Sequence, residues 1–317
     1  MLLSRVAESV YWVGRYLERA EDTARLVKVH TELFLDLPKA AGVGWFPLLA
    51  VTGTAATFRA RYEGATEEEV IGFLTSDPDN PGSILVSLSK ARANMRVTRS
   101  VFAGEAWHAL NDFHQWASDT CDEAVDRRTR VRWTEALVHR CQLLTGQMDG
   151  VMSHDQAYAF IEMGRFLERA DMTSRVLDVQ ADVLLGVGDH LGPYTDVTWM
   201  SVLRSVNAHQ MYRRAGNPAV SGSEALRFLL KDVQFPRSVE HCLTALARSL
   251  LELPRCQDPM AVCAELQGQL EAADVAALAE EGLHAWVDAL QEGIGDLHDV
   301  LADTYFAAPA DELLRIA

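Results

Sequence analysis

The chain has 317 residues, of which 49% are hydrophobic and 23% are charged. This composition is typical of a globular protein and excludes a disordered or a membrane-embedded chain. Its 45 acidic and 29 basic residues give a formal net charge of −16, which opposes binding to nucleic acid or to anionic lipid. We therefore expect neither nucleic acid nor a membrane among its partners.

The beginning of the chain does not resemble a secretory signal. Arg5 and Glu8 stand where such a segment needs an uninterrupted apolar run, and no later run approaches the length of a membrane span. The five cysteines are odd in number, are scattered and never form a Cys-x-x-Cys pair, so we expect reduced thiols and not disulfides or thiolate metal sites. These features predict a cytoplasmic protein.

The first predicted helix begins near residue 4 and has an apolar side. Steps of three and four residues place seven apolar residues on one face, and such a stripe is typical of a helix that faces a core. These residues are Val6, Val10, Val13, Leu17, Ala20, Ala24 and Val27.

The opposite side of the same helix carries a polar track, made of Ser4, Glu8, Tyr11, Arg15, Glu18, Asp22 and Arg25. Three interpretations are open: a solvated face, a buried Arg–Glu network between helices, and a ligand site. Pairs on a solvated face stabilise by only a few tenths of a kcal/mol, whereas buried charges persist only when they are paired. Gly14 lies beside the track, where it costs about 1 kcal/mol relative to alanine. This cost indicates that something approaches the backbone closely.

Later segments keep the helical spacing, and Pro and Gly fall between them. Glu105-x-x-His108 and Glu281-x-x-His284 have the spacing of di-iron ligands in helical bundles. A chain rich in glutamate with ten histidines produces such matches by chance, and the two motifs lie at non-equivalent places. We therefore expect solvated helix faces there, no metal and no cofactor.

The chain repeats itself. Residues 14–29 read GRYLERAEDTARLVKV and residues 164–179 read GRFLERADMTSRVLDV, while EEVIGFLTSDPDNPGSI at 68–84 is echoed by SEALRFLLKDVQFPRSV at 223–239. Such self-similarity predicts two repeats, at 1–152 and 153–317. We expect an all-α fold in which each repeat is an antiparallel bundle of five to six helices. The two would pack as one pseudo-twofold domain over residues 1–317.

The two versions of the polar track differ. The second reads His154, Tyr158, Ile161, Arg165, Glu168, Met172 and Arg175, so Ile161 and Met172 stand in place of Tyr11 and Asp22. We interpret the Glu-Arg pairs of both repeats as holding the bundle together. The additional polar groups Ser4, Arg5, Glu8 and Tyr11 would make the first repeat the binding or active half.

The opening LLSRVAESVYWVGRYLERAEDTARL and the later GRFLERADMTSR resemble the alpha-E family of bacterial proteins over essentially the whole chain. The residues that carry the resemblance are Glu8, Tyr11, Trp12, Gly14, Arg15, Glu18 and Arg19. Members of that family are typically encoded beside, or fused to, a circularly permuted ATP-grasp ligase, often with a transglutaminase-like peptidase. The resemblance implies a role in forming peptide or amide bonds. Since the chain has no room for a fused ATP-grasp domain, we expect a separate subunit.

The leading hypothesis is an accessory subunit that binds the ATP-grasp ligase, its peptide or amino-acid substrate, or both. The transglutaminase-like peptidase is a second candidate partner. Arginines would hold carboxylate groups through paired hydrogen bonds. The expected binding residues are Ser4, Arg5, Glu8, Tyr11, Arg15, Glu18, Arg19, Arg165, Glu168 and Arg169.

The alternative is an enzyme that transfers an acyl or aminoacyl group. Glu8 or Glu18 would then act as general base beside Tyr11. A general base needs a pKa near the working pH, and neighbouring arginines lower the pKa of a carboxylate. This consideration weighs against the enzyme hypothesis.

Overall fold

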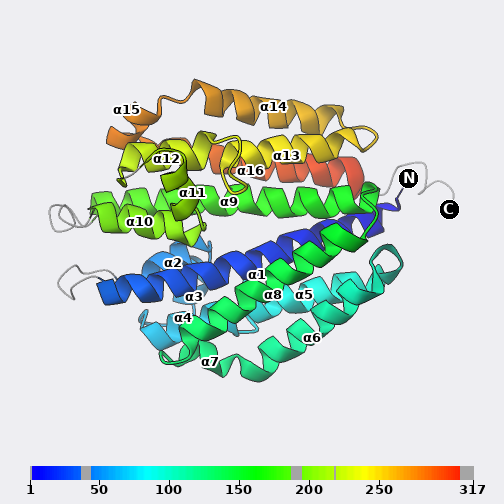
Figure 1. Ribbon diagram of the computed structural model, residues 1–317, viewed down its shortest axis with the longest axis horizontal. Coiled ribbons are helices and arrows are strands. Elements are labelled where there is room, and N and C mark those ends of the chain that lie inside the picture. The colour runs from blue at the N-terminus through cyan, green and yellow to red at the C-terminus, as the bar shows by residue number, and fades with distance from the viewer. Residues whose placement is uncertain (1, 37–43, 187–194, 218, 308–317) are drawn as a thin grey trace.

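The computed structural model describes residues 2–36, 44–186, 195–217 and 219–307, and every regular element in these ranges is a helix (Figure 1). The predicted all-α class is therefore confirmed. None of the described helices combines the length and the apolar character that crossing a membrane requires.

Helices of the first part of the chain are α1 (Ser4–Asp36), α2 (Phe46–Val51), α3 (Ala55–Arg59), α4 (Glu67–Thr75), α5 (Ile84–Val97), α6 (Gly104–Thr120), α7 (Asp122–Val125) and α8 (Arg130–Val151), with a 3-10 turn at Arg99–Val101. Those of the second part are α9 (Gln156–Gly186), α10 (Thr195–Ser205), α11 (His209–Arg214), α12 (Gly222–Lys231), α13 (Val239–Leu251), α14 (Gln257–Ala272), α15 (Val275–Glu280) and α16 (Leu283–Tyr305). Among the described elements, five helices of the first part and six of the second have nine residues or more.

Local sequence explains where several helices begin. The Thr66 hydroxyl accepts from the Glu69 backbone N–H while the Glu69 carboxylate accepts from the Thr66 N–H, so α4 begins with a capping box. Ser83 and Ser238 cap α5 and α13 through their hydroxyls. The serine matched between the two predicted repeats therefore has the same local role in both.

Two long helices, α1 and α9, run side by side through the middle of the molecule (Figure 1). Helices α5 and α8 pack on α1, whereas α13 and α16 pack on α9. The two long helices begin at the same end, where the Leu2 N–H donates to the Gln156 side chain over 3.2 Å. This arrangement makes the α1–α9 contact the centre of the fold.

Because α1 has helices around it, both of its sides are buried. Val10, Val13 and Ala20 of the apolar stripe are fully buried, as the spacing predicts. Glu18 and Asp22 of the polar track are also buried, with 3% and 2% of their surface exposed. The interpretation as a solvated face is therefore wrong for the middle of the track.

Candidate functional site

Helices α1 and α9 meet backbone against backbone at Gly14 and Gly164. A Cβ atom on Gly14 would overlap the Ile161 carbonyl oxygen, and one on Gly164 would overlap the Tyr11 carbonyl oxygen. Only a residue without a side chain fits such an approach. The close contact inferred from a mid-helix glycine is thus the crossing of the two central helices.

Beside this crossing, the Glu-Arg motifs of the two helices bind each other. The Arg19 Nε lies 2.5 Å from Glu168 Oε1, and the Arg15 Nε lies 2.6 Å from Glu168 Oε2. In the opposite direction, Arg169 Nε lies 2.7 Å from Glu18 Oε1. Each glutamate is thus held by arginine from the other half of the chain. The pairs of the motif form a buried network between helices.

The arginines determine the protonation of both glutamates. Burial by itself raises the pKa of Glu168, but Arg19 and Arg15 outweigh burial and hold that pKa at about 2. Burial likewise opposes ionisation of Glu18, and Arg169 and Arg237 lower its pKa to about 2. Both groups are therefore ionised at neutral pH and are poor bases.

Arg237 joins the network from the turn before α13, and sequence reasoning missed it. Its terminal nitrogens lie 2.6 Å from Glu18, 3.0 Å from Glu21 and 2.5 Å from Asp22. The matched segments around Ser83 and Ser238 put Gly82 in the corresponding place of the first half. The sequence signal was a pair of differences between the matched segments. Arg237 of the second half corresponds to Gly82 of the first, and Asp22 of the first half corresponds to Met172 of the second.

Asp22 is the carboxylate that the network satisfies least. Its Oδ2 atom is buried and has no hydrogen-bond partner among the described residues. Burial is the main reason that its pKa rises to about 7; Glu18 and Glu21 act in the same direction and Arg237 opposes them.

Tyr11 is also buried. Its hydroxyl lies 2.8 Å from His298 Nδ1 on α16 and accepts a 3.1 Å hydrogen bond from Arg15. The rings of Trp12 and Phe306 pack against it. Burial raises the pKa of Tyr11, although Arg15 opposes the shift. This hydroxyl has internal partners and, with 0% of the residue exposed, no route to solvent.

Three of the remaining predicted binding residues lie near the start of α1, and the fourth, Arg165, lies beside the crossing but is paired with Glu162. Arg5 and Glu8 are exposed near the start of α1, and the Ser4 hydroxyl donates to the Ala307 carbonyl oxygen over 3.4 Å. Arg165 donates to Glu162 over 2.6 Å. The ten residues predicted to bind a ligand therefore do not line a single cavity.

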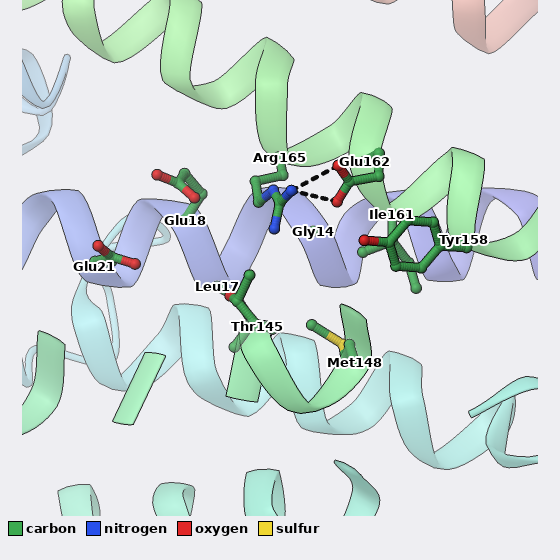
Figure 2. A pocket seen from close by; sticks show the side chains of 10 residues that line it. All are labelled: Gly14, Leu17, Glu18, Glu21, Thr145, Met148, Tyr158, Ile161, Glu162 and Arg165. Carbon is green, nitrogen blue, oxygen red and sulfur yellow. Dashed lines mark hydrogen bonds and ion pairs between the residues drawn. The ribbon is translucent and has the colours of Figure 1, made fainter. Parts of the chain in front are cut away.

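A small cavity lies next to the crossing (Figure 2). It measures about 10 Å³, which is near the minimum for one water molecule. Figure 2 shows the Glu162–Arg165 pair above Gly14, with Thr145 and Met148 of α8 on the other side. An amino acid does not fit in this space.

The two motifs with di-iron spacing are on different parts of the fold. Glu105 and His108 are on α6, which packs on α5 and α8, whereas His284 is on α16, which packs on α9 and α14. His284 Nδ1 lies 2.5 Å from Asp178, and Asp288 is also within 4.8 Å of this group. His284 Nε2 in turn lies 3.5 Å from Asp288, so both ring nitrogens of this histidine face carboxylates.

Comparison with known proteins identifies one family whose model matches the chain, and no solved structure that matches it. The model of a family described as "a predicted alpha-helical domain with a conserved ER motif" matches residues 2–306.

An uncharacterised protein of Mycobacterium bovis is 26% identical to the chain over 333 residues, a match that covers 96% of this chain and 37% of that protein. Uncharacterised proteins from two strains of Mycobacterium tuberculosis match with the same identity and coverage. The chain thus spans little more than a third of the length of these relatives.

Proposed function

The chain belongs to the Alpha-E family, and from this premise we propose that it is an accessory subunit of an ATP-grasp peptide or amide ligase system. It binds the circularly permuted ligase, and its surface holds the peptide or amino-acid substrate. A transglutaminase-like peptidase is a second candidate partner. We place this role in the cytoplasm, where the five cysteines, all free in the structure, would stay reduced.

The observation that carries this proposal is the reciprocal binding of Glu18 and Glu168 by arginines of the opposite half. These charges neutralise each other inside the protein, so the motif that defines the family has a structural role. If the signature residues hold the helices together, partners and substrate must bind to other residues, on the surface of the protein. A scaffold that binds partners fits this division better than a catalyst does.

We also infer that residues 1–152 and 153–317 are two copies of one unit, related by a pseudo-twofold axis at the Gly14–Gly164 crossing. The matched helix lengths support this inference: α1 and α9 have 33 and 31 residues, α5 and α13 have 14 and 13, and α8 and α16 have 22 and 23. The reciprocal contacts at the crossing support it as well.

The alternative role in acyl transfer gains no support from the site. Glu18 has a pKa of about 2, far below the range in which a general base works at neutral pH. Tyr11 is fully buried, and Glu8 is exposed at the start of α1. These three candidates therefore do not form a catalytic group open to a substrate.

The proposal is tested by mixing the purified chain with the circularly permuted ATP-grasp ligase of the same organism and measuring the mass of the complex by light scattering. We expect a complex of fixed stoichiometry and a ligase rate that rises when the chain is present. Two separate species at micromolar concentrations, with an unchanged rate, would rule out the accessory role.

A further inference from the structure

A groove of about 470 Å³ runs along the outer side of α9, next to α13. Tyr158, Ala159 and Phe166 are buried residues along it, whereas Asp155, Arg248 and Glu252 are exposed. The full lining is His154, Asp155, Tyr158, Ala159, Glu162, Phe166, His241, Ala245, Arg248, Ser249 and Glu252. An aromatic floor with a charged rim is typical of a binding site.

The corresponding face of the first half is filled. The repeat places Trp12 where the groove has Glu162, and Lys90 where it has Ala245. Trp12 stacks on Tyr16 with ring centroids 5.1 Å apart, and Lys90 Nζ lies 5.5 Å over the Tyr16 ring. In the first half, the larger side chains of Trp12 and Lys90 therefore cover the ring of Tyr16. In the second half, Glu162 and Ala245 leave the corresponding surface open as the groove. This contrast assigns the open surface to the second half, whereas the sequence had indicated the first.

Electrostatics restricts what the groove can hold. Asp155, Glu162 and Glu252 line it, against Arg248 on the rim and Arg165, which is paired with Glu162. Its formal charge is therefore still negative when the two histidines are neutral. The buried ring of Tyr158 stacks on His154 with centroids 4.0 Å apart and adds aromatic surface to the groove. A ligand with ammonium groups and an apolar side chain complements these walls.

Length indicates the size of the ligand. Residues 155–166 of the α9 wall and 241–252 of the α13 wall each span eleven helical steps, or about 16 Å at 1.5 Å per residue. An extended chain of about five residues covers that distance. A free amino acid would occupy only a fraction of it.

We propose that the groove between α9 and α13 binds a short cationic peptide, with amino groups toward the exposed carboxylates of Asp155 and Glu252 and an apolar side chain on Phe166. This proposal rests on the proposed function and specifies its substrate class. Ionic contacts at the rim would make binding weaken with salt.

The test is fluorescence anisotropy of the full chain with the pentapeptide Lys-Phe-Lys-Ala-Lys, labelled at its C-terminal end and free at its amino end. We expect it to bind at least about tenfold more tightly than the matched acidic peptide Glu-Phe-Glu-Ala-Glu, a difference of about 1.4 kcal/mol. Equal binding of the two peptides, or binding of neither up to millimolar concentration, overturns the proposal.

Variants locate the binding. Glu162→Trp and Ala245→Lys introduce the residues of the filled face, and we expect each to weaken peptide binding about tenfold or more. Ser89→Lys adds the same charge at an exposed position of α5 and should leave binding unchanged. Circular dichroism checks that each variant is folded, and Glu252→Lys on the exposed rim provides a change that cannot disturb the core. Binding that all three groove variants retain would place the peptide elsewhere.

Failure of this test is separable from failure of the proposed function. The ligase complex is measured by mass in the absence of peptide. A chain that forms the complex but does not bind the peptide contradicts the groove proposal alone.

Discussion

Arg19 donates two hydrogen bonds to the Glu168 carboxylate, 2.5 and 3.0 Å long, although the two residues are 149 positions apart in the chain. Together with the bond from Arg169 to Glu18, this contact holds the two central helices across their crossing. The stability of the whole fold should therefore depend on a few buried charges.

Replacing Glu168 with Gln should lower the free energy of unfolding by about 3 to 5 kcal/mol, because Arg15 and Arg19 would lose their charged partner inside the protein. Urea unfolding measures this change. Glu135→Gln removes an ion pair to Lys28 that lies partly in solvent, and a change of less than about 1 kcal/mol is expected there. Equal effects at the two sites would contradict the structural role of Glu168.

Gly164→Ala should destabilise the protein by about 1 to 3 kcal/mol or more, since the added methyl group would separate α1 from α9. Gly146→Ala on α8 is the matched control, because a Cβ atom there meets nothing within 4 Å. Alanine at that exposed helical position should stabilise by up to about 1 kcal/mol. Thermal unfolding of both variants distinguishes a crowded glycine from an exposed one.

Arg237→Gly should destabilise strongly, by about 3 to 5 kcal/mol, because three buried carboxylates, those of Glu18, Glu21 and Asp22, would lose the cation that binds them. Adding Asp22→Met should recover part of this loss, because the corresponding places on the other side of the crossing hold the combination of Met172 and Gly82. The two changes thus form a double-mutant cycle. Strictly additive losses would show that the two positions are independent.

The pH dependence of stability should follow two opposite trends. The pKa of Asp22 is raised in the folded state from 3.8 to about 7, so the stability it contributes is complete below about pH 4 and is lost as the pH rises to 7. The pKa of Glu18 is lowered from 4.5 to about 2. Its contribution is therefore present above pH 4.5 and is lost as the pH falls toward 2.

Asp22→Asn isolates the first trend. Asparagine does not ionise, so the free energy of unfolding of this variant should change less than that of the wild type between pH 4 and pH 7. The exposed Asp299→Asn should retain the profile of the wild type. If the free energy of unfolding of Asp22→Asn fell between pH 4 and pH 7 as steeply as that of the wild type, the pH dependence would belong to other groups.

Much of the centre of the molecule could be read from the sequence. The apolar stripe, the mid-helix glycine and the recurring Glu-Arg pair each follow from local spacing, and together they predicted the α1 core face, a close backbone approach and a charged contact between helices. The paired arrangement of Glu18 with Arg169 was one of three interpretations, because spacing along one helix does not reveal what packs against it.

Two features could not be read in this way. Arg237 reaches Asp22 across 215 positions, and only the packing of α13 on α9 brings the turn before it to α1. The groove between α9 and α13 exists because Glu162 and Ala245 have smaller side chains than the corresponding Trp12 and Lys90. Comparing the two halves position by position gives a signal for both features, since Gly82 and Lys90 are the corresponding residues.

The reciprocal contacts at the Gly14–Gly164 crossing have the form of an isologous interface, in which the same patch of two subunits meets itself. On our proposal that the two halves are copies of one unit, a single copy would pair with a second copy as a homodimer. Covalent joining of the two copies in one chain would then make the association independent of protein concentration. Each half is then free to change its own surface, as the filled face beside α1 and the open groove beside α9 illustrate.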